Sequence, residues 1–293
     1  MGSWRTSSGL AVALALATAG CGGASGGDVS AADRPERIVS LSPSATEILF
    51  GVGAGEQVVA VDSESDHPPG APATDLSAYQ PNVEAIAGFR PDLVVVPDSV
   101  PRDVIGGLRR LRLRVLVEAP PRGLAGAYRE MRRLGAVTGH AEAGRRLAQR
   151  VRTRIEHLMA AAPAAGLDVF HELDPDLYSA SSSSFIGHIY KRLGLRNVAD
   201  PAGRRAGTAY PQLASEGVVA ADPDLVVLAD SECCAQTPAK VARRPGWQSV
   251  SAVRNGAVVA VDDDIASRWG PRIPTFVERV VEAIELAREP ADR

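Results

Sequence analysis

Acidic side chains and histidines follow predicted strands in both halves of the chain. In the first half Asp62, Glu64 and Asp66 come after the apolar run at residues 58–61. Carboxylates combined with an imidazole suit several divalent ions. However, loops at strand ends are commonly acidic, and the chain has neither an H-x-x-x-H motif nor paired-cysteine spacing, so we assign no metal ligand. The candidates across the two halves are Asp62, Glu64, Asp66, His67, His171, Glu172 and residues 262–264.

Serine, histidine and aspartate are the residue types of hydrolytic triads, but their presence alone carries no geometry. The chain has no Walker loop or zincin motif, and residues 35–293 contain no G-x-S-x-G elbow. The serine run at residues 181–184 is better interpreted as a loop that offers backbone groups to a ligand. We therefore expect no enzyme. A secreted hydrolase and a metal-ion-binding protein are the less favoured alternatives.

Three cysteines are present, and two of them are adjacent. If Cys21 is acylated, Cys233 and Cys234 are the only free thiols, and an exported protein places them in an oxidising compartment. Three states are open for this pair: a disulfide between the neighbours, two reduced thiols, or a bond to another molecule.

Length and charge limit the class of protein. The chain of 293 residues is long enough for two modest domains or one large one. Its net charge of −3 argues against a general nucleic-acid binder. Many arginines fall between residues 102 and 154, but their helical spacing is typical of a solvated helix face.

The first residues have the pattern of an export signal. Arg5 precedes an apolar run at residues 10–19 that is too short for a permanent membrane span, and small residues stand directly before Cys21. This resembles a bacterial lipoprotein box, although Thr18 stands where such boxes usually carry Leu. We predict a signal peptide at 1–20 and a lipid-anchored flexible tether at 21–34, which places the protein on the extracytoplasmic face of the cell membrane. An ordinary secretory signal is the alternative.

Strand and helix patterns alternate from residue 35 to residue 140. Ser44 and Glu47 have capping-box spacing and predict a helix over residues 45–52, and Asn82 is the expected cap of a helix that ends near Ala87. The run at residues 93–96 has almost no polar alternation, as in a parallel sheet. We predict an α/β lobe with strands at residues 37–41, 58–61, 93–96 and 115–117.

A long amphipathic helix is predicted at residues 141–162, and similar text lies on either side of it. PDLVVV at residues 91–96 matches PDLVVL at residues 223–228, and each follows a helix-like segment with an acid near its start, Glu84 or Glu216. Alternation restarts over 163–293, so we predict an α/β fold: two lobes with mainly parallel sheets joined by a single long backbone helix, and a ligand cleft between them. A surface helix of one α/β domain is the alternative.

Together, several segments resemble the helical-backbone family of extracytoplasmic solute-binding proteins for ABC importers, which includes receptors for cobalamin, ferric siderophores and haem. The resemblance covers residues 35–287 and implies two lobes rigidly joined by one long helix. The segments that carry it are RIVSLSPSATEILFGVGAGEQVVAVD, SDHPP, YQPNVEAIAGFRPDLVVV, YPQLASEGVVAADPDLVVL and ASRWGPRI.

Within the family the chain is most similar to cobalamin-binding receptors. The resemblance implies that Glu84 and Glu216, one on each lobe, dock on arginines of the membrane permease through charge-assisted contacts. The alternative is that both acids only favour the N-termini of their helices. The implied partners are a permease dimer with its ATPase subunits and a small chelate ligand, with no nucleic acid, and the receptor is expected to be a monomer.

The same resemblance implies the ligand contacts. Tyr79, Tyr178 and Tyr210 stand where cobalamin receptors place aromatic rings against the corrin, although Trp is common at the first and third positions. Asp264 matches an acid that contacts the nucleotide portion, and Glu64 replaces an expected aromatic. The ligand is expected to be a cobalt corrinoid rather than a cofactor of catalysis. The alternative is haem or an anionic ferric siderophore, the latter held by Arg204, Arg205, Arg268 and Arg272.

Overall fold

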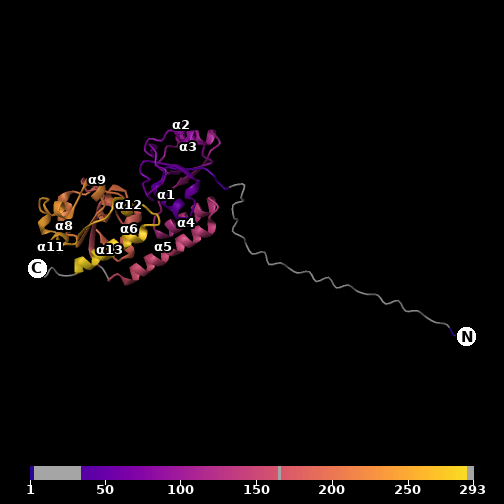
Figure 1. Ribbon diagram of the computed structural model, residues 1–293. Helices are drawn as coiled ribbons and strands as arrows, with labels where there is room; N and C mark the ends of the chain where they lie inside the picture. Colours follow the sequence, from indigo (N-terminus) through magenta and orange to yellow (C-terminus); the bar gives the residue numbers. More distant parts are fainter. Residues whose placement is uncertain (3–33, 164–165, 289–293) are drawn as a thin grey trace.

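The computed structural model describes residues 1–2, 34–163 and 166–288, which form two α/β lobes (Figure 1). The sheet of the N-terminal lobe has the order β2-β1-β3-β4 and is parallel throughout. Both faces of its central strands are covered, which explains why the run in β3 lacks polar alternation. The strands are β1 (Ile38–Ser40), β2 (Val58–Val61), β3 (Leu93–Pro97) and β4 (Arg114–Glu118).

The C-terminal lobe repeats this topology. Its parallel sheet has the order β6-β5-β7-β8, so β7 occupies the position that β3 has in the first lobe. The two PDLVV segments are therefore equivalent strands, and the predicted fold class of two mainly parallel lobes is confirmed. The strands are β5 (Asp168–Glu172), β6 (Arg196–Asn197), β7 (Leu225–Leu228) and β8 (Val258–Ala260).

Capping side chains start two helices of the first lobe, and one predicted cap is wrong. The helix α1 begins at Pro43, because the Ser42 hydroxyl accepts a hydrogen bond from the backbone N–H of Ala45. Ser44 lies inside the helix, so no capping box forms with Glu47. The Asn82 cap is confirmed, since its side chain accepts from two backbone N–H groups. The helices are α1 (Pro43–Gly51), η2 (Gly55–Gln57), α2 (Val83–Gly88), α3 (Arg102–Arg110) and α4 (Leu124–Val137).

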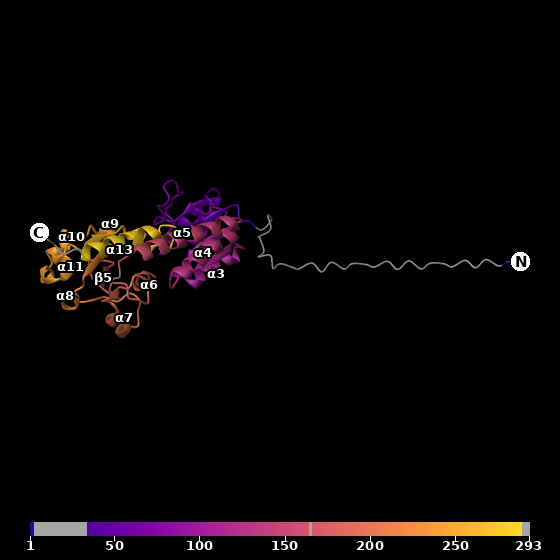
Figure 2. The ribbon, with the colours of Figure 1, turned by 90° about the horizontal axis from the view of Figure 1, so that it is seen from below.

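The helix α5 (Ala141–Ala161) runs along both lobes, packed against α4 in the first lobe and against α13 (Ile273–Arg288) in the second (Figures 1 and 2). Leu147, Val151 and Ile155 are buried, as its periodicity predicts. The backbones of α4 and α5 approach closely where Gly135 faces Gly144, since a Cβ built on Gly135 would lie 2.8 Å from the Gly144 Cα. The prediction of one long helix shared by the lobes is confirmed.

The second lobe contains short helices that its sequence does not predict. One or two turns are too short to show helical periodicity, and several of these helices begin at capping side chains within loops. The helices of this lobe before α13 are α6 (Phe185–Arg192), α7 (Asp200–Ala206), α8 (Ser215–Ala221), α9 (Ser231–Cys234), α10 (Pro238–Ala242), η3 (Trp247–Ser249), α11 (Ser251–Arg254) and α12 (Asp263–Ser267).

One hydrophobic core crosses the lobe junction. It joins Val95 of the first sheet, Ile155 of α5 and Phe276 of α13 to Val227 of the second sheet. Two smaller cores cover the outer faces of the sheets. The lobes therefore share buried surface and are more than two bodies on a linker. Within residues 34–163 and 166–288, no helix combines the length and the apolar character needed to cross a membrane.

Candidate ligand cleft between the lobes

A cavity of about 350 Å³ lies between the lobes, at the carboxyl ends of the parallel strands. Ligands of parallel α/β proteins commonly bind at this edge, because the loops that leave the strands converge there. The first lobe contributes the loops after β1, β2 and β3, and the second contributes α12 and the segment that follows it. The principal lining residues are Ser42, Ser44, Asp62, Glu64, Tyr79, Ser99, Asp264, Ser267, Arg268 and Trp269.

Arg268 connects the two lobes at this cavity. Its side chain, 8 % exposed, lies 2.6 Å from an Asp264 carboxylate oxygen in its own lobe. Toward the other lobe it donates to the Asp66 carboxylate at 2.9 Å and to the backbone carbonyl of Glu64 at 2.7 Å. A guanidinium has enough donors in one plane to serve these acceptors together. Arg268 thus sets the position of the Glu64 loop relative to α12.

A second ionic contact lies deeper at the junction. Glu47 on α1 is buried and accepts from Arg272 at 2.6 Å, and its carboxylate lies 3.5 Å from Arg268. A buried charge without a partner is costly, and these two guanidinium groups supply the opposite charge to Glu47 inside the junction. Arg272 thus has a structural role, whereas the sequence also offered it as a siderophore ligand.

Burial raises the pKa of two carboxyl groups that line the cleft. Desolvation raises the pKa of Asp62 to about 6, although its carboxylate accepts a 2.5 Å hydrogen bond from Ser65. Desolvation also raises the pKa of Asp264 to about 6, against the opposing charge of Arg268. Both groups are mainly ionised at neutral pH. With Glu64, the cavity then presents three carboxylates and one guanidinium, which favours hydrogen-bond donors over anions.

The three predicted tyrosines lie on both lobes, and only one lines this cavity. Tyr79 is 84 % exposed and forms part of the cavity wall in the first lobe. In the second lobe Tyr178 is 41 % exposed and Tyr210 is 46 % exposed, and neither lines the cavity. Burial raises the pKa of the Tyr210 hydroxyl. A ligand that contacts all three rings must extend beyond the cavity.

The serine-rich loop borders a separate hollow of about 400 Å³ beside Tyr210. Ser184 caps α6 by accepting from the backbone N–H of Gly187, and Ser182 donates to the Asp200 carboxylate through its N–H and its hydroxyl. The loop is thus largely occupied by internal hydrogen bonds. Arg204 lines the hollow, while Arg205 is exposed without lining it.

The two predicted docking acids occupy equivalent positions. Glu84 lies in the first turn of α2 and Glu216 lies in the first turn of α8, and both are exposed. Figure 1 places α2 at the tip of the first lobe and α8 on the second lobe, away from the junction. No ion pair within residues 34–163 and 166–288 occupies either carboxylate, so neither has a structural partner that accounts for it.

Several of the metal candidates are committed to other contacts. His171 is buried 2.6 Å from the Tyr190 hydroxyl, and burial lowers its pKa to about 3. Glu172 forms a two-point ion pair with Arg244 at 2.6 and 2.5 Å, and the Asp262 carboxylate caps α12. In the part of the chain that the structure describes, no group of three or more His, Cys, Asp or Glu side chains could hold a metal ion.

Asp230 is a buried acid beside the Glu172–Arg244 pair. Desolvation, followed by the charge of Glu172, raises the pKa of Asp230 to about 7, while Arg244 opposes the shift. Asp230 is fully buried and follows β7 at the carboxyl edge of the second sheet. Asp230 was not predicted as a site residue, because a single acid after a strand forms no motif.

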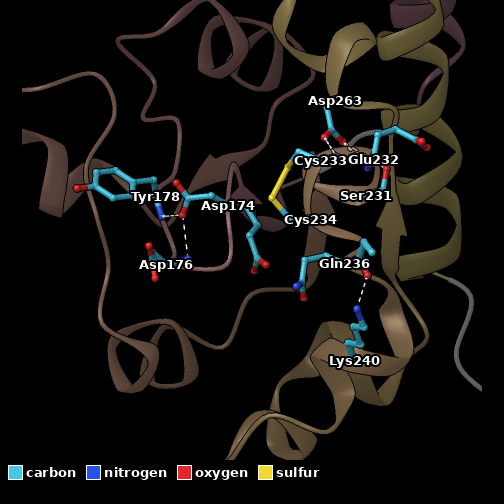
Figure 3. The surroundings of a disulfide bond; sticks show 12 residues. Asp174, Asp176, Tyr178, Ser231, Glu232, Cys233, Cys234, Gln236, Lys240 and Asp263 are labelled. Atoms are coloured by element: carbon cyan, nitrogen blue, oxygen red, sulfur yellow. Dashed lines mark hydrogen bonds between the residues drawn. A yellow bond between two sulfur atoms is a disulfide. The ribbon is translucent and has the colours of Figure 1, made fainter.

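Cys233 and Cys234 form a disulfide with each other, which decides between the three states left open (Figure 3). Cys21 lies outside the described residues.

Trp269 was not predicted as a cleft residue. Only the packing of α12 against the first lobe shows that it lines the cavity.

Comparison with protein families supports this geometry. The sequence matches the family model described as periplasmic binding protein over residues 38–265. A cobalamin-binding protein of Halobacterium salinarum is 31% identical over 258 residues, which cover 85% of this chain and 69% of that protein. An uncharacterized ABC transporter substrate-binding lipoprotein of Bacillus subtilis is 28% identical over 272 residues, which cover 89% of this chain and 83% of the relative.

Solved structures share the architecture. The periplasmic vitamin B12 binding protein of Vibrio cholerae superposes with a TM-score of 0.72 at 26% identity, covering 87% of this chain and 98% of that one. A periplasmic heme-binding protein of Roseiflexus sp. RS-1 superposes with a TM-score of 0.74 at 24% identity, covering 86% and 99%. The second similarity concerns the fold alone.

Proposed function

The chain belongs to the periplasmic binding protein family, and from this we propose that it captures cobalamin or a related corrinoid and delivers it to an ATP-driven importer. The observation that carries the proposal is the composition of the interlobe cavity. Tyr79 from one lobe and Asp264 from the other line the same space, at the positions that the resemblance assigned to ligand contacts.

The charge of the cavity favours a corrinoid over the alternatives. A corrinoid is a flat macrocycle whose rim carries amide groups, and amide N–H groups are donors for carboxylates. Asp62, Glu64 and Asp264 offer acceptors of this kind, and the Tyr79 ring offers apolar area to the macrocycle. Haem propionates and anionic siderophores would instead place negative charge near three carboxylates, with Arg268 already occupied by the lobe contacts.

We place the receptor outside the cytoplasm as a monomer, anchored by a lipid on Cys21. Its partners are then a permease dimer with its ATPase subunits, and its role is stoichiometric binding without turnover. The lipoprotein and transporter names of the Bacillus subtilis relative support this assignment.

Isothermal titration tests the ligand. Residues 34–293, which contain the two lobes, are titrated with cyanocobalamin, haemin and a ferric hydroxamate siderophore. Saturable one-to-one binding of cyanocobalamin alone is the expected result. Binding of haemin or the siderophore alone would overturn the corrinoid assignment while keeping the receptor class, and catalytic turnover of a captured ligand would overturn the receptor itself.

Two variants locate the site. Tyr79→Ala should weaken cyanocobalamin binding about tenfold, because it removes an aromatic contact worth roughly 1.5 kcal/mol. Asp264→Asn should also weaken binding, whereas Asp103→Asn, an exposed acid in the first turn of α3, should leave the affinity unchanged. Equal cyanocobalamin affinities for all three variants would show that the ligand binds outside this cavity.

A further inference from the structure

The disulfide between Cys233 and Cys234 lies at the edge of the second sheet where a ligand would contact this lobe. Both cysteines belong to α9, which directly follows β7. Cys233 is exposed and Cys234 is half-buried, so the sulfur atoms lie at the surface rather than in the core. Since β5, β7 and β8 are parallel, the segments that follow them meet at one edge.

On one side, α9 is attached to the wall of the cleft. The Asp263 carboxylate accepts hydrogen bonds from the backbone N–H groups of Cys233 at 2.8 Å and of Glu232 at 3.1 Å. Ser231 adds a hydrogen bond from its hydroxyl to the carbonyl of Val261 at 3.0 Å. Asp263 is followed by Asp264, which lines the interlobe cavity. The position of the disulfide is thus fixed relative to that cavity.

On the other side lies the loop after β5. Asp174, Asp176 and Tyr178 belong to the surroundings of the disulfide (Figure 3). The Asp174 carboxylate organises this loop by accepting from the backbone N–H groups of Asp176 at 2.9 Å and of Tyr178 at 3.2 Å. The disulfide therefore lies between the Tyr178 loop and α12, two segments with predicted ligand contacts.

A purely structural role does not account for this bond. A disulfide stabilises a fold mainly by restricting the unfolded chain, and the effect grows with the length of the loop that it closes. Adjacent cysteines enclose no other residue, so this contribution is small. The hydrogen bonds to Asp263 already hold α9 in place. What the bond adds is a fixed pair of sulfur atoms at the surface.

We propose that the Cys233–Cys234 disulfide is a ligand contact of the second lobe, which presents an apolar sulfur surface between the Tyr178 loop and α12. This inference rests on the proposed function and names a new part of the same site. Sulfur is polarizable and packs favourably against conjugated rings, so the bond suits the face or edge of a macrocycle. The disulfide also holds both sulfur atoms in one arrangement, whereas two thiols would rotate independently and bind less favourably.

The test compares cyanocobalamin affinity with the disulfide intact, blocked and deleted, in the full chain carrying Cys21→Ala. Dithiothreitol transfers two electrons and two protons to the S–S bond, which gives two thiols while the reagent closes to its cyclic disulfide. Iodoacetamide then caps both thiols. We expect about tenfold weaker binding after capping and about fivefold weaker binding for the double variant Cys233→Ala with Cys234→Ala, by loss of the sulfur contact.

Two controls separate contact from folding. Thermal unfolding of the capped and double-variant proteins should match that of the oxidised protein, and Ser249→Ala, elsewhere in the same lobe, should keep full affinity. In addition, bound cyanocobalamin should slow the capping of the reduced thiols, which a structural role does not predict.

The outcomes are distinguishable. If the oxidised protein binds cyanocobalamin and the capped protein binds it equally well, the disulfide contact is wrong and the proposed function stands. If only haemin or the ferric hydroxamate binds, the same comparison is made with that ligand, and the corrinoid assignment alone fails. If the oxidised protein binds none of the three, the proposed function fails and the contact inference fails with it.

Discussion

Asp264 has two roles at the scale of single residues, because it faces the cleft and is paired with the arginine that connects the lobes. The ion pair with Arg268 and the burial of the carboxyl group act on its pKa in opposite directions, and burial prevails. A carboxyl group whose pKa lies near 6 changes its charge within a range that binding assays can reach.

Cyanocobalamin affinity should therefore increase from pH 5 to pH 7.5. The ionised carboxylates of Asp264 and Asp62 accept amide hydrogen bonds, whereas the protonated forms accept them less well, and a difference of about threefold to tenfold is expected. Titration calorimetry at both pH values measures this change. Asp264→Asn should reduce the difference, and a pH dependence that is the same in the variant would contradict the assignment.

Asp230 gives a second prediction, which concerns stability. Its pKa is raised to about 7 in the folded protein, against an ordinary value of 3.8, so the folded state keeps a proton that the unfolded state releases. The stability that the retained proton contributes is fully present below about pH 4. It decreases above that pH and is lost as the pH rises through 7. Asp230→Asn removes this loss of stability, and the variant should exceed the wild type in stability by up to about 4 kcal/mol at pH 8.

Urea denaturation at pH 5 and pH 8 measures this difference. The advantage of Asp230→Asn should be smaller at pH 5 than at pH 8, because at pH 5 the folded carboxyl group is still protonated and only the unfolded state has released its proton. A difference of the same size at both pH values would show that another effect of the substitution dominates.

Single residues were predictable where a motif or a resemblance marked them. The resemblance marked Tyr79 and Asp264, and both line the cavity, while their contact with a ligand stays a prediction. Glu47 was assigned to a helix cap because local spacing was the only information available. Its partners, Arg268 and Arg272, are more than two hundred residues away in the chain, so only the packed lobes bring the three charges together.

At the scale of elements, the contact between α4 and α5 depends on two glycines. A Cβ on Gly144 would lie 2.8 Å from the Met131 carbonyl oxygen and 3.1 Å from the Gly135 Cα. These neighbours are backbone atoms, which cannot rotate away as a side chain does. The two helices can lie this close only if position 144 has no side chain. The position of the first lobe on α5 depends on the same contact.

Gly144→Ala should therefore destabilise the protein by about 1 to 3 kcal/mol through overpacking. The matched control is Gly106→Ala inside α3, where the nearest neighbour is the flexible Arg110 guanidinium at 3.5 Å. There alanine should stabilise the helix by up to about 1 kcal/mol. Thermal unfolding of both variants measures the effects, and a stabilised Gly144→Ala protein would contradict the packing argument.

The predictability of the elements followed their length and regularity. The strand β2 has the bounds expected from its apolar run, and α5 ends within one residue of its predicted end. The short helices α7, α9 and α10 were missed, since one or two turns are too short to show helical periodicity, and only α10 has a capping side chain, Thr237. The helix α9, which carries the disulfide, has four residues and was missed for this reason.

At the scale of the whole molecule, the shared core and the buried ion pairs oppose movement of one lobe against the other. Separation would expose apolar residues around α5 and would remove Glu47 from its two guanidinium partners. Both costs are incurred together, so the lobes should keep one arrangement.

Small-angle X-ray scattering with and without cyanocobalamin tests this rigidity. We expect the radius of gyration to stay within the error of the measurement, unlike that of receptors that close about a hinge. A clear decrease in the radius of gyration on ligand binding would show that one lobe moves against the other. Saturation must be confirmed by calorimetry on the same sample.

The docking on the importer that we propose is also a property of the whole molecule, since it would require one acid on each lobe at a constant separation. Replacing both acids, Glu84→Lys with Glu216→Lys, should abolish cobalamin uptake by cells and leave the binding affinity unchanged. Glu285→Lys, an exposed acid on α13, is the matched control and should keep uptake. Loss of affinity in the double variant would exclude a docking role.

The general architecture was predictable because the sequence repeats itself. Two PDLVV strands on either side of one long helix indicate two related lobes, and the equal sheet orders bear this out. The cleft was less predictable: the lining contributed by Ser44, Ser99 and Trp269 depends on how the lobes are set against each other. No local pattern carries that information.

The core that crosses the lobe junction has a consequence for how empty and loaded receptors compete for the importer. A receptor with one arrangement presents Glu84 and Glu216 in the same way whether its cleft is filled or empty. If the importer docks on these two acids, empty receptors occupy it as readily as loaded ones and act as competitive inhibitors. Uptake would then depend on the fraction of receptors that are loaded, and producing more receptor at a fixed supply of vitamin would slow transport rather than speed it.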